Sequence, residues 1–562
     1  MNSGNLSNMV MIDIESDDGI RRVQEQDGVS LYELSEKYYK NDQGMSAIFA
    51  LVNDEGRDLL YRISKPCTVK FLNMTERLAR LSYQRTVFFI YLMAEDMLFP
   101  NSFSVLRYPL NGGIYIQLRN IPDKSLDVVY RIEKKMRDII QENLVLERTI
   151  IRREEILTEN PPECISPELA DFVKNCEVQE IFNYSCGDFS ALFYDPLLPC
   201  TGLINLFEIV PYEEGIILRV PQFENPSELS EYRDDVKLFE AFRDISKWRK
   251  HIGVRYIYDL NQNIMKGAYH DMMLVTEAFQ EKKIAVLADE IVQKNKRIIL
   301  IAGPSSSGKT TFAQRLCIQL RANGKKPLYM GTDDYFLERD QVPRDENDKF
   351  DFEALSAVDV DLFNNHMNDL LEGKTVDMPV FDFITGSKRY GMRIARAEAD
   401  QPIVIEGIHA LNDELTKGIY EGYKYRIYIS PLTALNIDKF NRIPVTDIRL
   451  LRRIARDIRS RGKTAKQTLA EWMSVREGEI KNIFPYIKSA DALFNSAFIY
   501  ELAVIKPLVE PGLLEVKRGD DEYLEAERLL RILRCVKPIT DINTISNNSI
   551  IREFLGGGIW VK

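Results

Sequence analysis

The residues at positions 303–311 have the types and spacing of a phosphate-binding loop. Gly303 and Gly308 bracket four residues and are followed by Lys309 and Thr310. Glycines let successive backbone N–H groups face a di- or triphosphate, the lysine reaches the β- and γ-phosphates, and the threonine hydroxyl holds Mg²⁺. The pattern therefore predicts binding of ATP with Mg²⁺. The predicted nucleotide-binding residues are Gly303, Pro304, Ser305, Ser306, Ser307, Gly308, Lys309, Thr310 and Thr311.

Two local elements must position this loop. The apolar run at 298–302 predicts a buried strand before it, and residues 312–321 predict a helix that ends near Gly324. A phosphate-binding loop requires this order of strand, loop and helix. The alternative is a glycine-rich turn that binds no ligand.

Acidic residues follow two further apolar segments. Asp333 and Asp334 come after the predicted strand at 327–330, and Glu406 follows the predicted strand at 403–405. Ligands of open parallel sheets bind beyond the carboxyl ends of the strands, so these acids should face the nucleotide. We expect Asp333 to act as the catalytic base and Glu406 to help hold the metal with Thr310. A helix cap or a solvated strand end is the alternative, and the choice between Asp333 and Asp334 stays open.

Arginines are concentrated at residues 447–463, around apolar positions at helical spacing. Arginines supplied by a mobile lid can stabilise the charge of a transferring phosphoryl group. We therefore predict catalytic roles for Arg453 and Arg456, beside Lys309. A merely solvated basic face is the alternative.

Composition limits the class of protein. A chain of 562 residues should form three or four domains, and its net charge of −11 argues against a broad nucleic-acid footprint. The seven cysteines show no C-x-x-C spacing, which indicates neither a disulfide framework nor a zinc ribbon. No apolar run is long enough to span a membrane, and the first residues lack the order of a signal peptide. We expect a soluble, cytoplasmic protein without a membrane partner, and a homo-oligomer stays open.

Residues 1–75 predict a small α+β module, with strands at 10–14 and 69–72 and a helix at 30–39. This order resembles the TGS domain, a ubiquitin-like fold at the front of threonyl-tRNA synthetases.

Residues 76–224 are similar to the second additional domain of threonyl- and alanyl-tRNA synthetases, as indicated by the segments 83–86, 111–116, 186–189 and 199–202. That family edits mischarged tRNA at a metal site. The positions of its ligands fall here on Arg85, Phe89, Phe193 and Leu197, none of which can serve as such a ligand. We therefore expect no zinc and a scaffold or binding module, through which alone the chain could contact RNA.

Two segments carry no readable chemistry. Residues 225–293 predict a helical connector with an apolar stripe that includes Leu238, Phe242 and Trp248. Residues 513–562 predict a C-terminal helical extension. Both should serve packing.

Residues 294–512 contain several motifs in a fixed order: 303–311, 333–336, 350–351, 379–383, 404–407 and 453–463. Together they resemble the uridine kinase and phosphoribulokinase family. The resemblance implies an α/β P-loop kinase domain, a parallel sheet with helices on both faces. It also implies that Asp351 lies near sugar hydroxyls, that Phe381 contacts the base, and that Arg453 and Arg456 belong to a lid. The substrate-contacting residues expected from it are Asp334, Tyr335, Asp351, Phe381, Asp382 and Arg461.

Three positions depart from the uridine kinase pattern. Phe381 stands where the family has tyrosine, Gly386 where it has histidine, and Glu471 where the lid has glutamine. All three concern recognition of the nucleoside, so phosphoryl transfer is the firmer expectation. A nucleoside is the expected acceptor, with a sugar or sugar phosphate as the alternative. The whole arrangement resembles bacterial uridine kinase-like nucleoside kinases.

A regulatory nucleotide switch or an RNA-binding protein is the rival interpretation, because TGS-like domains also occur on regulatory GTPases. A GTPase reads guanine through an N-K-x-D loop, and none follows Gly303. The paired acids and the arginine-rich segment favour an ATP-dependent kinase.

Overall fold

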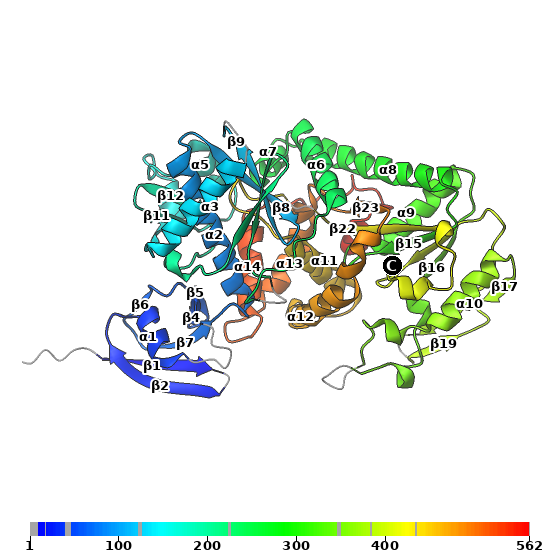
Figure 1. Ribbon diagram of the computed structural model, residues 1–562, viewed down its shortest axis with the longest axis horizontal. Helices are drawn as coiled ribbons and strands as arrows, with labels where there is room; N and C mark the ends of the chain where they lie inside the picture. Colours follow the sequence, from blue (N-terminus) through cyan, green and yellow to red (C-terminus); the bar gives the residue numbers. More distant parts are fainter. Residues whose placement is uncertain are drawn as a thin grey trace, which may run out of the picture.

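The computed structural model describes residues 9–16, 18–39, 46–121, 126–222, 226–344, 350–382, 385–432 and 435–560. In Figure 1 a small N-terminal module lies below a mixed α+β region, and a larger α/β region occupies the opposite side of the molecule. Long helices run between the two sides.

The N-terminal module is a five-stranded sheet with the order β2-β1-β7-β4-β5, in which β1 and β7 are parallel. Its elements are β1 (Met9–Ser16), β2 (Gly19–Gln26), β3 (Val29–Ser30), α1 (Leu31–Tyr38), β4 (Phe49–Val52), β5 (Glu55–Arg57), β6 (Arg62–Ile63) and β7 (Cys67–Leu72). Ser30 and Glu33 form a capping box that fixes the start of α1. The strands and the helix predicted for this segment are present; its likeness to a TGS domain stays a prediction.

The second region wraps two sheets around a buried helix, α2 (Arg77–Leu98). One sheet has the order β13-β14-β9-β8 and the other the order β10-β11-β12. The remaining elements are β8 (Phe103–Leu110), β9 (Gly113–Arg119), α3 (Leu126–Gln141), β10 (Glu147–Arg152), α4 (Arg153–Ile156), α5 (Pro167–Lys174), β11 (Glu180–Cys186), β12 (Phe189–Phe193), β13 (Glu208–Tyr212) and β14 (Gly215–Arg219). Phe89, Phe193 and Leu197 are core residues here, and Arg85 lies 2.7 Å from Asp195.

Three helices form the predicted connector: α6 (Val236–His251), α7 (Ile257–Met265) and α8 (Tyr269–Gln293). The apolar stripe of α6 joins both sides of the molecule. Phe242 stacks on Tyr108 of β8 with ring centroids 4.1 Å apart, and Trp248 stacks on Phe279 of α8 at the same distance. The stripe is therefore a packing face.

The kinase-like region is built on a parallel sheet with the order β16-β21-β15-β22-β23. The strands are β15 (Ile298–Ala302), β16 (Leu328–Gly331), β21 (Ile403–Glu406), β22 (Lys424–Ser430) and β23 (Ala492–Asn495). Alternate residues of β15 face opposite sides, as strand geometry requires. Ile299 and Ile301 pack with α8, α9 (Lys309–Ala322), α11 (Val445–Ser460) and α13 (Glu501–Leu514), whereas Ile298 and Leu300 pack with α6 and α10 (Val360–Leu371). The prediction of a parallel sheet covered by helices on both faces is confirmed.

Short elements surround this sheet. Two hairpin-like pairs, β17 (Thr375–Asp377) with β20 (Ile394–Arg396) and β18 (Val380–Asp382) with β19 (Ser387–Arg389), lie near α10 in Figure 1. The helix α12 (Ala465–Asn482) packs on α11. The 3-10 helices are η1 (Thr201–Leu203), η2 (Thr332–Tyr335), η3 (Arg339–Gln341), η4 (Leu355–Ala357), η5 (Asp413–Thr416), η6 (Glu421–Tyr423) and η7 (Phe484–Ser489).

The end of the chain is integrated into the kinase-like region. The boundary predicted at residue 512 falls inside α13, and α14 (Tyr523–Arg534) and α15 (Arg552–Leu555) pack against α13 and α11. Their apolar residues belong to the same core as Phe312 of α9. The extension is thus part of the body that carries the phosphate-binding loop.

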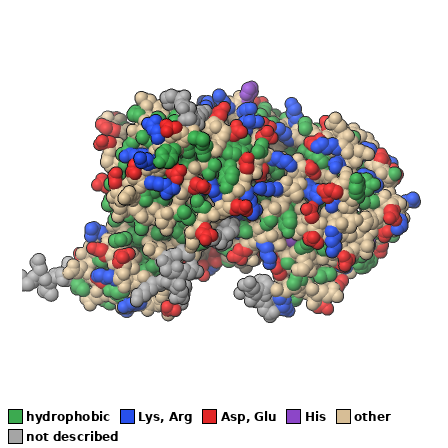
Figure 2. Space-filling view, in the orientation of Figure 1, with side chains coloured by type: hydrophobic (Ala, Val, Ile, Leu, Met, Phe, Trp, Pro, Cys, Tyr) green, Lys and Arg blue, Asp and Glu red, His purple; other side chains and the backbone are tan. Residues whose placement is uncertain are grey.

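The face of the molecule drawn in Figure 2 has no large area in which all charged side chains carry the same sign. In Figure 2 basic and acidic side chains are interspersed over the whole face. Among the described helices, none combines the length and the apolar character needed to cross a membrane.

Candidate active site

The predicted phosphate-binding loop lies between β15 and α9. A Cβ atom on Gly303 would lie 2.1 Å from the Ile429 carbonyl oxygen, so no larger residue fits there. Ser306 and Gly308 have φ angles of +60° and +88°. Alternating handedness of this kind turns backbone N–H groups toward one point, which is the geometry that holds phosphate.

The side chains of the loop have unused hydrogen-bonding capacity. Within the described residues, the buried hydroxyls of Ser306 and Ser307 have no hydrogen-bond partner. The Lys309 ammonium donates to the carbonyl oxygens of Gly303 and Pro304 at 2.8 and 3.2 Å. Burial lowers the pKa of Lys309, although the charges of Glu406 and Asp333 oppose this. Orphaned donors and a desolvated cation fit a bound polyphosphate.

The predicted metal-holding pair is brought together at the carboxyl edge of the sheet. Thr310 Oγ1 donates to Glu406 Oε1 at 2.9 Å, and the Tyr329 hydroxyl donates to the same oxygen at 3.2 Å. Burial raises the pKa of Glu406 to about 7, with the Lys309 charge acting in the opposite direction. A hydroxyl and a carboxylate are the oxygen ligands that Mg²⁺ prefers, so these residues fit that ion.

Asp333 and Asp334 occupy different surroundings in η2. Asp333 is exposed at the surface of the site, and desolvation of its carboxyl group raises its pKa against the opposing charge of Lys309. Asp334 accepts the N–H of Phe381 at 3.4 Å and lies 3.2 Å from Arg393 Nη1. Of these two acids, Asp333 is the one whose charge acts on Lys309, whereas Asp334 is held in an ion pair with Arg393.

A further carboxylate, which the sequence reasoning missed, belongs to this group. Burial raises the pKa of Glu353, and the charges of Lys309 and Arg453 oppose the shift. The sequence feature that could have indicated Glu353 is its position two residues after Asp351 of the predicted motif. Asp351 itself caps a turn, because Oδ1 accepts the N–H groups of Glu353 and Ala354, each at 3.0 Å.

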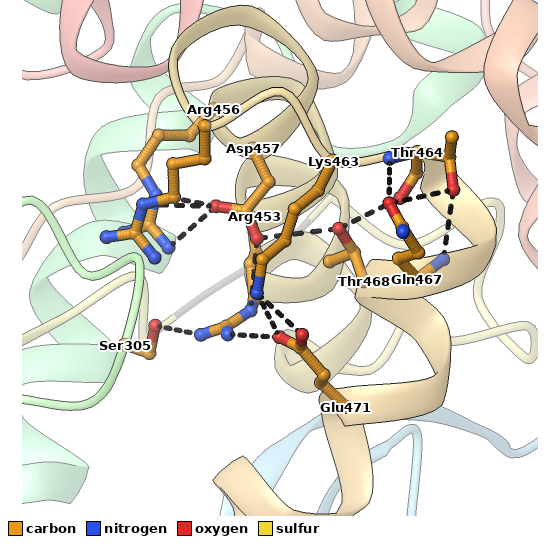
Figure 3. Close-up of polar contacts among 10 residues, drawn as sticks. Ser305, Arg453, Arg456, Asp457, Lys463, Thr464, Gln467, Thr468 and Glu471 are labelled. Carbon is orange, nitrogen blue, oxygen red and sulfur yellow. Dashed lines mark hydrogen bonds and ion pairs between the residues drawn. The ribbon is translucent and has the colours of Figure 1, made fainter. Parts of the chain in front are cut away.

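The predicted lid arginines converge on acids of α11 and α12 (Figure 3). Arg453 Nη1 donates to Ser305 Oγ at 2.9 Å, and its Nη2 lies 3.3 Å from Glu471. Arg456 lies 3.2 Å from the fully buried Asp457, and Arg461 Nε lies 3.5 Å from it. Of the three arginines, Arg453 is the one that touches the phosphate-binding loop.

Two arginines that the sequence reasoning did not single out brace the same loop. Arg449 Nε donates to the Ser305 carbonyl at 3.2 Å and pairs with the buried Glu479, whose Oε1 accepts the Ser305 N–H at 3.1 Å. Arg452 pairs with Glu501 at 2.7 Å. Arg449, Arg452 and Arg453 are therefore buried beside the loop, whereas Arg459 and Arg461 of the same segment are exposed.

The C-terminal extension contacts the loop from another direction. Glu553 Oε2 accepts the Thr311 hydroxyl at 3.0 Å, and a Cβ on Gly308 would lie 2.3 Å from Ile550 Cγ2. Both residues belong to the segment 513–562, for which the sequence predicts packing alone. Glu553 instead occupies hydrogen-bond donors at the start of α9, where anions are favoured.

The side chains of three predicted substrate contacts are engaged with other parts of the protein. Tyr335 is fully buried, and its hydroxyl lies 3.2 Å from His366 Nδ1. Phe381 is 5% exposed and packs edge-on against Phe336. Asp382 accepts the Thr385 N–H at 3.2 Å. Tyr335 is a core residue, so its predicted contact with substrate does not fit its placement. Phe383, the last residue of that predicted motif, lies outside the described residues.

Comparison with known proteins decides the class of this region. The model of the phosphoribulokinase and uridine kinase family matches residues 298–498. Those residues form a P-loop domain of that family. Kinases of this family use ATP and Mg²⁺ in general, which agrees with the residues around Lys309. The match begins at β15, so the resemblance of the two front regions to synthetase domains stays a prediction.

The curated relatives described here each match about a third of this chain. The uridine kinase of Ligilactobacillus salivarius is 27% identical over 183 residues, 32% of this chain and 76% of that protein. The uridine kinase of Chloroflexus aggregans is 28% identical over 207 residues, 36% of this chain and 88% of that protein. A solved structure of a possible uridine kinase from Bacillus stearothermophilus is 21% identical, with a TM-score of 0.26, and covers 38% of this chain and 97% of that one.

Proposed function

We propose that this protein is a kinase that transfers the γ-phosphoryl group of ATP to a hydroxyl of a small molecule. The observation that carries the proposal is the convergence of Lys309, Asp333 and Glu406 at the carboxyl edge of the parallel sheet, beside the phosphate-binding loop. This edge is where ligands of such sheets bind.

Each residue has a role that its surroundings support. The Asp333 carboxylate would accept the proton of the attacking hydroxyl, and its raised pKa makes it a better base than an ordinary aspartate. Lys309 would bind the phosphates, while Thr310 and Glu406 would hold the metal. Arg453, fixed against Ser305, would stabilise charge on the transferring group. Bound ATP and Mg²⁺ would supply the phosphoryl group and the neutralising charge.

A nucleoside is the acceptor that the comparisons favour, because the curated relatives named above are uridine kinases. The departures at Phe381, Gly386 and Glu471 concern recognition of that nucleoside, so a sugar or sugar phosphate is the second candidate. Phe381 is buried and Asp382 is half-buried, and neither placement favours a nucleoside over a sugar or sugar phosphate as the acceptor.

A screen for ADP release tests the proposal. Full-length protein would be incubated with ATP, Mg²⁺ and single nucleosides, sugars or sugar phosphates, and the Lys309→Ala variant would be the background. Acceptor-dependent ADP release that the variant lacks supports a kinase. Nucleotide binding without release for any acceptor would favour a regulatory or RNA-binding protein instead.

A further inference from the structure

A small cavity lies where the second region, the connector and the kinase domain meet, and none of its lining residues belongs to the phosphate-binding loop. Four arginines line it: Arg107 of β8, Arg249 at the end of α6, Arg255 between α6 and α7, and Arg442 before α11. No Asp or Glu is among the described residues that form its walls. The cavity volume is about 40 Å³, more than a single water requires.

Two of the four arginines bring charge to the cavity that no acidic side chain pairs with. Neither Arg255 nor Arg442 makes a side-chain hydrogen bond or ion pair with any residue in the described ranges. Burial lowers the pKa of Arg442 to about 10, and burial together with the charge of Arg107 lowers the pKa of Arg249 to about 10. Guanidinium groups stay protonated in proteins, so the half-buried Arg442 and the exposed Arg255 each bring an unpaired positive charge to the cavity.

The nearest acids are engaged elsewhere. Asp447, whose charge acts on Arg442, pairs with Arg528 at 2.6 Å and also with Arg77. Glu501, whose charge acts on Arg249, pairs with Arg452. The carboxylate of Asp259 accepts the backbone N–H groups of Arg255 and Tyr256 at 2.7 and 3.0 Å.

A local irregularity of β8 places one of the arginines. The register with β9 shifts between Leu106 and Pro109, and Arg107 lies within the shift. Such bulges redirect side chains and are common beside functional sites. The Arg107 guanidinium is then held by Gln117, whose Oε1 accepts from its Nε and Nη2 at 3.1 and 2.7 Å.

Backbone hydrogen bonds fix the three segments relative to one another. The Leu106 N–H donates to the Lys439 carbonyl at 3.1 Å, and Asn436 Nδ2 donates to the Leu106 carbonyl at 2.9 Å. The Ile257 N–H donates to the Asn436 carbonyl at 3.0 Å. The arginines are therefore presented by rigid elements, as a preformed site requires.

We propose that this cavity is a binding site for a phosphate group, distinct from the phosphate-binding loop. The planar guanidinium group of arginine can donate two parallel hydrogen bonds to phosphate oxygens. The hydroxyls of Ser246 and Tyr256, which line the same cavity, are further hydrogen-bond donors. A phosphate there neutralises charge contributed by all three segments. It also fixes Arg442, just before α11, the helix whose Arg449 and Arg453 contact Ser305.

Titration of inorganic phosphate into the full-length protein tests the site. The phosphate-binding loop is first saturated with ADP and Mg²⁺, and chloride keeps the ionic strength constant. We expect one phosphate per chain by calorimetry, and at least tenfold weaker binding for Arg442→Gln and for Arg107→Gln. The matched control is Arg243→Gln, an exposed arginine of α6 outside the cavity, which should bind within twofold of the parent.

Melting temperatures separate a ligand site from a structural cluster. In phosphate-free buffer Arg442→Gln should melt at the same temperature as the parent or higher, because it removes repulsion. Phosphate should raise the melting temperature of the parent and of Arg243→Gln, and leave Arg442→Gln unchanged. The proposal would be overturned if both cavity variants still bound phosphate, or if chloride raised the melting temperature as much as phosphate does. It would also be overturned if Arg442→Gln melted several degrees below the parent without phosphate. The test needs no turnover, so it is independent of the proposed kinase activity.

Discussion

Glu471 of α12 lies 3.3 Å from the guanidinium of Arg453 on α11. The same carboxylate lies 2.6 Å from Lys463 Nζ. Glu471 thus partly neutralises Arg453, the arginine that contacts Ser305 of the phosphate-binding loop, and it stands where the uridine kinase pattern has glutamine.

We expect Glu471→Gln to increase ATP affinity or the transfer rate, because Arg453 then keeps its full charge for phosphate. The gain should be roughly two- to fivefold, as for other partly exposed ion pairs. ATP titration and single-turnover kinetics measure it. Glu477→Gln, an exposed glutamate on the same helix, is the control. An unchanged or weaker variant would show that Glu471 does not restrain Arg453.

Lys309→Ala should reduce catalysis by on the order of a hundredfold or more, because it removes the cation that follows the γ-phosphate into the transition state. Lys325→Ala, which breaks only the surface ion pair with Asp400, should keep normal turnover. Steady-state ADP release with the best acceptor provides the measurement. Near-normal turnover of a folded Lys309→Ala protein would refute the assigned role.

Asp333→Asn and Asp334→Asn separate chemistry from structure. If Asp333 is the base, its variant should keep most ATP affinity while losing roughly two to four orders of magnitude in rate. Asp334→Asn should have a milder effect on rate and should lower stability, because Arg393 loses its charged partner. Single-turnover transfer, ATP titration and thermal unfolding distinguish these outcomes. The reverse pattern of rates would move the base to Asp334, and full rates for both would exclude acid–base catalysis at this strand end.

The sequence was sufficient to predict those parts of the candidate site that are built from residues close together in the chain. The strand, loop and helix around Lys309 lie within one short segment, and Asp333 and Glu406 follow strands whose parallel pairing could be expected. The contacts that support the loop could not be predicted, because Glu479 and Glu553 come from distant parts of the chain. Composition alone suggested a mobile basic segment at α11, whereas the buried partners Asp457, Glu479 and Glu501 give that helix a structural role.

His409 should make the protein sensitive to acid. Its side chain is 1% exposed, neither ring nitrogen has a hydrogen-bond partner among the described residues, and burial lowers its pKa to about 4. Between pH 6.5 and 4 the unfolded chain therefore binds a proton that the folded chain does not, so stability falls as the pH falls. We expect the parent to lose on the order of 2–3 kcal/mol more than His409→Leu between pH 7 and 4.5.

Denaturant unfolding at the two pH values measures this difference. The exposed His251 supplies the control, because His251→Gln should lose as much stability as the parent. Equal acid sensitivity of His409→Leu and the parent would contradict the prediction.

The second region should hold no catalytic zinc. Arg85 is paired with Asp195, and Phe89, Phe193 and Leu197 have no donor atoms. Metal analysis of the purified full-length chain should find well under one zinc per chain, and a chelator should leave the melting temperature unchanged. A tightly held stoichiometric zinc would show that ligands other than these positions exist.

The contacts of Ile550 and Glu553 with the phosphate-binding loop also bear on how the protein is made. A ribosome releases the chain from its N-terminus, and regions formed early can fold before the rest is synthesised. Ile550 and Glu553, which pack on the loop at Gly308, are translated long after the loop itself. A nascent chain that has not yet reached residues 550–553 therefore carries a phosphate-binding loop without two of its supports.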